Sequence, residues 1–125
     1  SGDKVGGILV ETSGDIVTVG CGLNLWWADP IEGARGLLGR DPGDSIAPAL
    51  AAAWVEALVG YLEKGSEAWP REAYEEASLT LGREVTWEDG TGSAVAIADD
   101  GALVVAQGDE LVVLRAGEVH TQDRR

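Results

Sequence analysis

Two apolar segments near the start of the chain are separated by one short turn. Residues 4–11 and 16–25 are rich in Val, Ile and Leu, and the sequence Thr12-Ser13-Gly14-Asp15 between them is typical of a hairpin turn. Strands joined by so short a connection pair antiparallel, because a parallel pair needs a long crossover. The sequence therefore predicts a β-hairpin over residues 4–25.

Both predicted strands are interrupted by glycines. The first contains Gly6-Gly7 after Lys4, and the second contains Gly20-Cys21-Gly22 before Asn24. Glycine inside a strand gives up packing and often marks the close approach of a ligand or of another backbone. Paired, the strands would form a bare patch edged by an ammonium and an amide, where an anionic ligand could lie. The alternatives are a surface lysine at a strand end and a bulge in the second strand.

The middle of the chain changes from loop to helix. Residues 29–44 are rich in Gly and Pro, which predicts a long loop with one helical turn near residues 34–38. Loops of this length are usually functional or mobile. Residues 45–64 carry apolar side chains at helical spacing and predict a long helix, and residues 67–77 predict a shorter one.

The last third of the chain has the pattern of a small β-domain. Short β-rich segments alternate with turn residues, which is typical of a small barrel or sandwich. We place the domain boundary near Ser78, with one domain over residues 1–77 and the other over residues 78–125. The five expected strands cover residues 83–88, 93–98, 102–107, 110–115 and 118–122.

The composition limits the classes of partner. The net charge is -13 and the pI is about 4.2, so the overall field repels nucleic acid and anionic membrane surfaces. A single cysteine excludes a disulfide framework or thiolate zinc cluster within the chain, and the lone His120 has no clustered partners, so no metal site is expected. With no signal peptide and no apolar run long enough to span a bilayer, we expect a soluble cytoplasmic protein.

The remaining candidates for chemistry are few. We expect Cys21 to be a small buried apolar residue. Trp26-Trp27 supply either core packing or a surface on which a ring can stack. No pairing of a nucleophile with a base is specific enough to predict covalent catalysis.

At these residues the sequence resembles the biotin protein ligases. The segment Lys4-Val5-Gly6-Gly7-Ile8-Leu9-Val10-Glu11 is similar to the family's "KxxGILxE" strand, and Gly20-Cys21-Gly22-Leu23-Asn24-Leu25 to its "GxGxNx" strand. Gly117-Glu118-Val119 is similar to a segment near the family's C-terminus. The fold implied is α+β: the second part of a class II synthetase-like catalytic domain, followed by an SH3-like β-barrel.

The resemblance implies an ATP-dependent biotin–[biotin carboxyl-carrier protein] ligase. Biotin and ATP, with Mg²⁺ accompanying the ATP, would give biotinyl-5′-AMP, which a lysine of a biotin carboxyl carrier domain then attacks. Lys4 is the implied catalytic residue and contacts the biotin carboxylate and the α-phosphate. The implied biotin-binding residues are Lys4, Gly7, Gly20 and Gly22, and the implied nucleotide-binding residues are Asn24, Trp26 and Trp27.

The resemblance also implies that other polypeptide is needed. The family's Gly-Arg-Gly-rich loop and several strands of the biotin pocket should precede these residues, so we expect the chain to act with an N-terminal remainder. A homodimer is left open. Near the C-terminus the family often has a nucleotide-contacting arginine where this chain has Gln122, so that Arg115, Arg124 or neither takes the role.

Two other functions remain open. A lipoate-type acyl ligase would use a similar lysine and similar adenylate chemistry on a longer, flexible acyl chain. A non-catalytic interaction module would keep only the fold.

Overall fold

The computed structural model describes residues 2–122 of the chain. These form two compact units, Ser1–Val59 and Gly60–Arg125, which are described separately. The second unit contains both the last turn of a long helix and the C-terminal sheet, so the division falls earlier than the sequence pattern suggests. The domain boundary at residue 78 stays a prediction.

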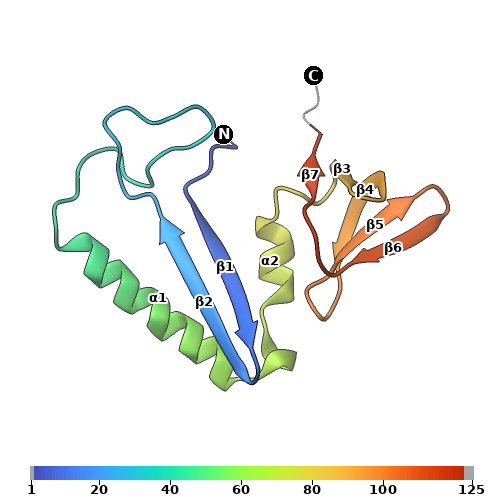
Figure 1. Cartoon of the computed structure of the whole chain (residues 1–125), viewed down its shortest axis with the longest axis horizontal. Coiled ribbons are helices and arrows are strands. Elements are labelled where there is room, and N and C mark those ends of the chain that lie inside the picture. Colours follow the sequence, from blue (N-terminus) through green and yellow to red (C-terminus); the bar gives the residue numbers. More distant parts are fainter. Residues whose placement is uncertain (1, 123–125) are drawn as a thin grey trace. The chain divides into compact units, whose positions relative to one another are not determined.

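The first unit begins with the predicted hairpin (Figure 1). Strand β1 (Gly6–Ser13) pairs antiparallel with β2 (Ile16–Leu23) along its whole length, with Ser13 opposite Ile16. Gly14 adopts a φ of 58° in the turn, a left-handed conformation that other residues rarely adopt. The hairpin predicted from the sequence is confirmed, but both strands stop two residues short at the open end, and Thr12 and Ser13, which were expected in the turn, belong to β1.

Apolar side chains of the hairpin lie exposed on both faces. Ile8 and Leu9, which point to opposite sides of β1, are 68% and 66% exposed, and Ile16 of β2 is 69% exposed. An isolated two-stranded hairpin is marginally stable in water. Apolar residues on both faces are typical of strands that are covered on both sides, and the described residues do not cover this hairpin.

Helix α1 (Ile46–Glu63) confirms the long helix predicted from the sequence. No residue of it is buried among the described residues, and Leu62 is 67% exposed. Its 18 residues have a mean hydropathy of 1.3, enough to cross a membrane by length and composition alone, a test that core helices of soluble proteins also pass. Leu50 and Trp54 of α1 line an apolar hollow of about 640 Å³ with Leu23 and Leu25, which favours the core-helix interpretation.

The second unit contains the two short helices. A 3₁₀ turn η1 (Ser66–Ala68) is followed by α2 (Arg71–Ala77). The single helix predicted over residues 67–77 is therefore wrong. Trp69 is extended, with φ −68° and ψ 144°, because the ring of Pro70 disfavours helical geometry in the residue before it.

A five-stranded antiparallel sheet completes the second unit. Its spatial order is β6-β5-β4-β3-β7, and the only register shift lies between Ala94 and Ala96 of β4. Among the described residues β6 and β7 are the edges, so the sheet is open and a closed barrel is not observed. All five predicted strands are present: β3 (Glu84–Trp87), β4 (Gly90–Ile97), β5 (Leu103–Gln107), β6 (Glu110–Leu114) and β7 (His120–Thr121).

The buried core lies in this sheet. Val85, Ala94 and Val105 are fully buried on one face, and Leu81 and Trp87 pack against them. Helix α2 is tied to the sheet by Glu75, whose Oε1 accepts a hydrogen bond from the backbone N–H of Ile97 at 3.0 Å. Among the described residues, the second unit therefore contains buried apolar side chains and the first unit contains none.

This difference predicts that the same substitution destabilises the two units to different extents. Val85→Ala removes buried methyl groups and leaves a cavity, so it should lower the free energy of unfolding by about 2 kcal/mol. Val17→Ala is the matched control, because Val17 is 61% exposed and should cost less than about 0.5 kcal/mol. Urea unfolding of the chain monitored by tryptophan fluorescence measures both. Equal losses would show that the hairpin is as well covered as the sheet.

Candidate functional site

Lys4 is held at the open end of the hairpin by the long loop. Its backbone N–H donates to the Gly33 carbonyl at 2.8 Å, and its carbonyl accepts from the Arg35 N–H at 3.0 Å, which makes a parallel bridge with Ala34. The loop therefore returns to the start of the chain. The helical turn expected near residues 34–38 is wrong. The N–H of Arg35 donates to Lys4, and those of Leu37 and Leu38 donate to Asn24 and Leu25, so these amides bond to distant segments instead of within a helical turn.

The side chain of Lys4 lies over a glycine of β1. Its Nζ and Cε are both 3.7 Å from the position that a Cβ on Gly7 would take. Strict alternation along a strand would put Lys4 and Gly7 on opposite faces, but β1 begins only at Gly6 and Lys4 belongs to the bridge with the loop. The ammonium therefore reaches the face on which Gly7 and Gly22 stand opposite each other.

The glycines of this face are not explained by packing. A Cβ on Gly22 would meet nothing within 4 Å, and one on Gly20 would meet only the Leu9 carbonyl, at 3.7 Å. Gly6 is different, because a Cβ there would collide with the carbonyl of Gly22. Gly6 is therefore required by strand pairing, whereas Gly7, Gly20 and Gly22 leave an open, bare surface of the kind that admits a ligand or another backbone.

Asn24 joins the hairpin, Lys4 and the loop. Its backbone N–H donates to the Val5 carbonyl at 2.7 Å, and its carbonyl accepts from the Leu37 N–H at 2.8 Å. Its side-chain Nδ2 donates to the Lys4 carbonyl at 3.4 Å. The bare patch edged by Lys4 and Asn24 that the sequence predicts is thus assembled in the structure, and its role in binding stays a prediction.

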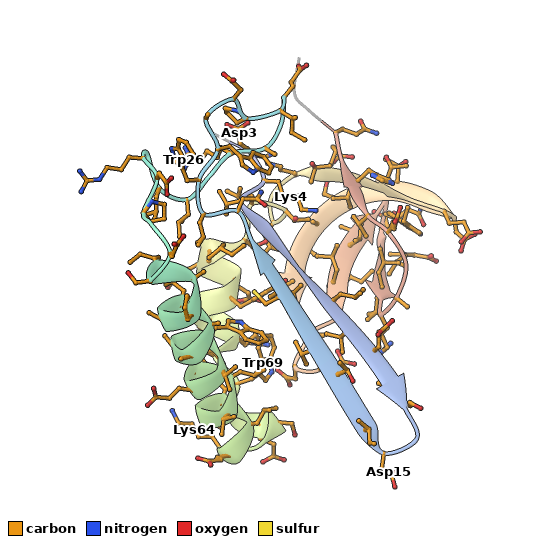
Figure 2. All side chains as sticks on the ribbon, turned by 60° about the vertical axis from the view of Figure 1, so that its left-hand side comes forward. Asp3, Lys4, Asp15, Trp26, Lys64 and Trp69 are labelled. Carbon is orange, nitrogen blue, oxygen red and sulfur yellow. The ribbon has the colours of Figure 1, made fainter. Side chains whose placement is uncertain are left out.

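The loop passes tightly over the backbone of Leu25 and Trp26. A Cβ on Gly36 would lie 2.7 Å from the Trp26 Cα and 3.0 Å from the Leu25 carbonyl, so only glycine fits. Trp26 and Trp27 are 36% and 39% exposed. Figure 2 shows Trp26 at the same end of the hairpin as Lys4, with Asp15 at the far end. Both tryptophan side chains are thus partly exposed to water, which is compatible with core packing and with a surface on which a ring can stack.

The structure brings the backbone of Arg35 next to Lys4, although no motif in the sequence selects this residue. It is exposed, and its backbone bond to Lys4 fixes its position. Of residues 1–59, only Lys4, Arg35 and Arg40 are basic. All the positive charge of the first unit therefore lies on Lys4 and the loop bonded to it, although the whole chain is strongly acidic. The feature of the sequence that could have pointed to Arg35 is the pair of glycines on either side of it, Gly33 and Gly36.

The predictions for Cys21, for the residues near the C-terminus and for a metal site have other outcomes. Cys21 is exposed rather than buried, because the hairpin is uncovered among the described residues. Gln122 donates from Nε2 to the Thr86 hydroxyl at 3.0 Å, and Arg115 donates from Nε to Asp100 at 2.9 Å, so both serve the sheet. Arg124 lies outside the described residues. Within residues 2–122, no three His, Cys, Asp or Glu side chains are grouped so as to hold a metal ion.

The close approach at Gly36 gives a test of the loop's attachment. Gly36→Ala should detach the loop from residues 24–26, because its methyl group would overlap backbone atoms that cannot rotate away. The amide of Leu38, which donates to Leu25 at 2.9 Å, should then exchange hydrogen at least ~tenfold faster. Gly39→Ala is the control, since a Cβ there meets nothing within 4 Å. If both variants exchange like the parent, the loop is not held at Gly36.

Comparison with known families gives a match in the C-terminal sheet. Residues 80–120 match the family model described as the biotin protein ligase C terminal domain. The match starts after α2 and reaches β7. A sequence comparison with curated proteins gives no significant match.

Solved structures extend the similarity to nearly the whole chain. The apo structure of biotin protein ligase from Aquifex aeolicus has a TM-score of 0.75 and 26% identity, over 97% of this chain and 60% of that one. The complex of the Aquifex aeolicus ligase with biotin and ATP has a TM-score of 0.72 and 25% identity, over 98% of this chain and 57% of that one. The chain thus spans less than two thirds of the length of these ligases. The resemblance inferred from the sequence is confirmed: residues 80–120 match the C-terminal domain of biotin protein ligases, and the chain as a whole is similar to them in structure.

Proposed function

We propose that this chain is the C-terminal portion of an ATP-dependent biotin protein ligase. In this function biotin and ATP form biotinyl-5′-AMP and pyrophosphate, and a lysine of a biotin carboxyl carrier protein then takes the biotinyl group. The proposal rests above all on one arrangement, the Lys4 ammonium lying over Gly7 at the end of the hairpin. It is supported by the similarity to a ligase structure that contains biotin and ATP.

The proposed role of Lys4 follows from its charge and fixed position. Attack of a carboxylate on the α-phosphate brings two anions together, and an ammonium between them reduces their repulsion. As the bond to pyrophosphate breaks, the same cation stabilises the charge on the phosphoryl oxygens. Lys4 is suited to this because hydrogen bonds to Gly33 and Arg35 fix its backbone on both sides.

The glycines and the loop would then form the rest of the site. Gly7, Gly20 and Gly22 would let biotin lie against the hairpin. The side-chain oxygen and remaining amide hydrogen of Asn24 suit an adenine edge, which offers both a donor and an acceptor. Trp26 and Trp27 would border the nucleotide, and the loop over residues 29–44 would exclude water from the adenylate. Mg²⁺ would enter with the ATP phosphates.

The exposed hairpin supports the N-terminal remainder of the ligase as a partner. Ile8 and Leu9 expose apolar surface on opposite faces, and a pair of strands buried on both faces is typical of the interior of a larger sheet. Strands of the remainder would pair with the hairpin and cover the helix α1 as well. The complete enzyme, with an SH3-like C-terminal domain, would be cytoplasmic, and it would act without membrane or nucleic-acid binding by this chain.

Replacing Lys4 tests the proposal directly. Lys4→Ala in the complete protein should lower the rate of biotinyl-AMP formation by at least ~10²-fold, since a fixed charge at the reacting phosphate is removed. Formation of biotinyl-AMP from radiolabelled ATP measures the rate. Lys64→Ala is the matched control, because Lys64 is the other lysine of the chain and its Nζ lies over the Tyr61 ring at 5.6 Å.

Equal activity of the two variants would remove Lys4 from the mechanism. It would also favour the non-catalytic interaction module, provided that the parent protein forms no adenylate either.

The choice of acyl substrate needs a separate measurement. Calorimetric titration of the complete protein with biotin and with lipoate should show biotin binding at least ~10²-fold tighter, since a bare strand surface fits a compact ring system better than a flexible chain. Gly22→Val should weaken biotin binding, because its side chain would fill space that is open in the structure. Tight binding of lipoate without binding of biotin would make the chain part of a lipoate-type ligase.

A further inference from the structure

Strand β6 is an unprotected edge of the C-terminal sheet. It ends the strand order, and its pairing with β5 runs without a bulge from Gln107–Glu110 to Leu103–Leu114. Figure 1 shows β6 along the border of the sheet. Edge strands are normally protected by a proline, a bulge or an inward charge. β6 has no proline and no bulge, and its one charged residue, Glu110, stands at its first position. The opposite edge, β7, is only two residues long.

The outward side of β6 is apolar in the middle. Leu111 and Val113 project from the face opposite the core and are 69% and 41% exposed. In a hairpin with a two-residue turn the residues next to the turn, here Gln107 and Glu110, share hydrogen bonds, and pairing then alternates. The N–H and C=O groups of Leu111 and Val113 therefore point away from β5, into the space beside the sheet.

Charged residues of opposite sign lie at the two ends of this edge. Asp109 precedes the strand and Arg115 follows it, and both are exposed. The Arg115 side chain is 67% exposed and is oriented by its Nε bond to Asp100 at 2.9 Å, which leaves its terminal nitrogens available. The edge is thus acidic in the turn at one end, apolar at Leu111 and Val113 in the middle, and basic just beyond the strand at the other end.

We propose that β6 pairs antiparallel with β6 of a second copy of this chain, with Val112 facing Val112 of the other copy on the two-fold axis. In this register Leu111 lies opposite Val113 of the other copy. Asp109 then lies opposite Arg115 of the other copy at each end.

The register follows from two independent conditions. When two identical strands pair antiparallel about a two-fold axis, the residues that stand opposite each other lie on the same face of the sheet. Because successive residues alternate between faces, odd-numbered residues must then stand opposite odd-numbered ones. The outward backbone groups belong to odd-numbered residues as well, and they then form about four hydrogen bonds across the axis. Of the registers that meet both conditions, centring on Val112 brings the opposite charges together, whereas centring on Val113 sets Arg115 against Leu111.

A second copy fits this edge better than an unrelated strand, because the order of charges is self-complementary. The pairing involves one short strand, so it should give a weak, concentration-dependent dimer. It uses only the second unit, which has its own core, and does not depend on the proposed ligase activity.

Sedimentation of the full chain over a range of concentrations tests the proposal. The parent should approach a dimer as the concentration rises, and Val113→Lys should raise the dissociation constant at least ~tenfold, since an ammonium would face Leu111 of the other copy. Val95→Lys is the control, because Val95 is 49% exposed but lies on β4, away from the edge. Circular dichroism should show both variants folded.

Disulfide trapping tests the register and stays informative if Val113→Lys fails to fold. In a Cys21→Ala background, a mixture of chains carrying Leu111→Cys and chains carrying Val113→Cys should cross-link on mild oxidation, because opposed Cα atoms lie ~5.5 Å apart. Each variant alone should cross-link much less, since diagonal neighbours are ~7–8 Å apart.

Three results would overturn the proposal. They are a parent that stays monomeric up to its solubility limit, a dimer that tolerates Val113→Lys as well as Val95→Lys, and cross-linking of Val113→Cys alone without cross-linking in the mixture.

Discussion

The candidate site depends on the backbone bonds between Lys4 and the loop. Gly33 accepts from Lys4 and Arg35 donates to it, so that one residue preceding β1 is held between the hairpin and a segment some thirty positions away. Without these two bonds Lys4 would continue β1 with ordinary alternation, and its side chain would leave the face of Gly7. The bridge therefore determines on which face of the hairpin the positive charge lies. It also brings Arg35 to that charge, and Gly36 then fits against Trp26.

The two units are stabilised in different ways. The second has a core of fully buried side chains, Val85, Ala94 and Val105, which supplies the apolar burial that offsets the loss of chain entropy. The first has backbone hydrogen bonds and partly covered side chains, but its apolar strands face water on both sides. Hydrogen bonds contribute little net free energy while both partners could instead bind water. The candidate site is thus carried by the unit that buries less apolar surface.

The sequence predicted the helices and strands better than it predicted which face of a strand a side chain occupies and whether that face is covered. The hairpin, α1 and the five C-terminal strands follow from periodicity and turn residues, which are local signals. The break at Trp69 was also readable, because Pro70 is a local signal that the helix pattern concealed. The faces are harder to predict: ordinary strand alternation does not apply to Lys4, because its geometry is set by a distant loop. Cys21 was predicted to be buried from its residue type, which assumes a covered strand. The closed barrel likewise requires long-range pairing between sheet edges, and no local pattern encodes it.

The charge distribution explains how an acidic chain could hold anionic ligands. A net charge of -13 raises the cost of bringing a carboxylate or phosphate near the protein. Charges more than about 10 Å away are largely screened at physiological salt, however, so the near neighbours of a ligand decide its binding. The first unit places its three basic residues, Lys4, Arg35 and Arg40, on one bridge and one loop. Glu11 and Asp15 instead lie toward the turn end of the hairpin, where Figure 2 shows Asp15 far from Lys4. The cations thus lie at one end of the bare glycine face, but Asp3 and the four acidic residues of the loop belong to the same segments, so binding of an anion there depends on close contact with Lys4.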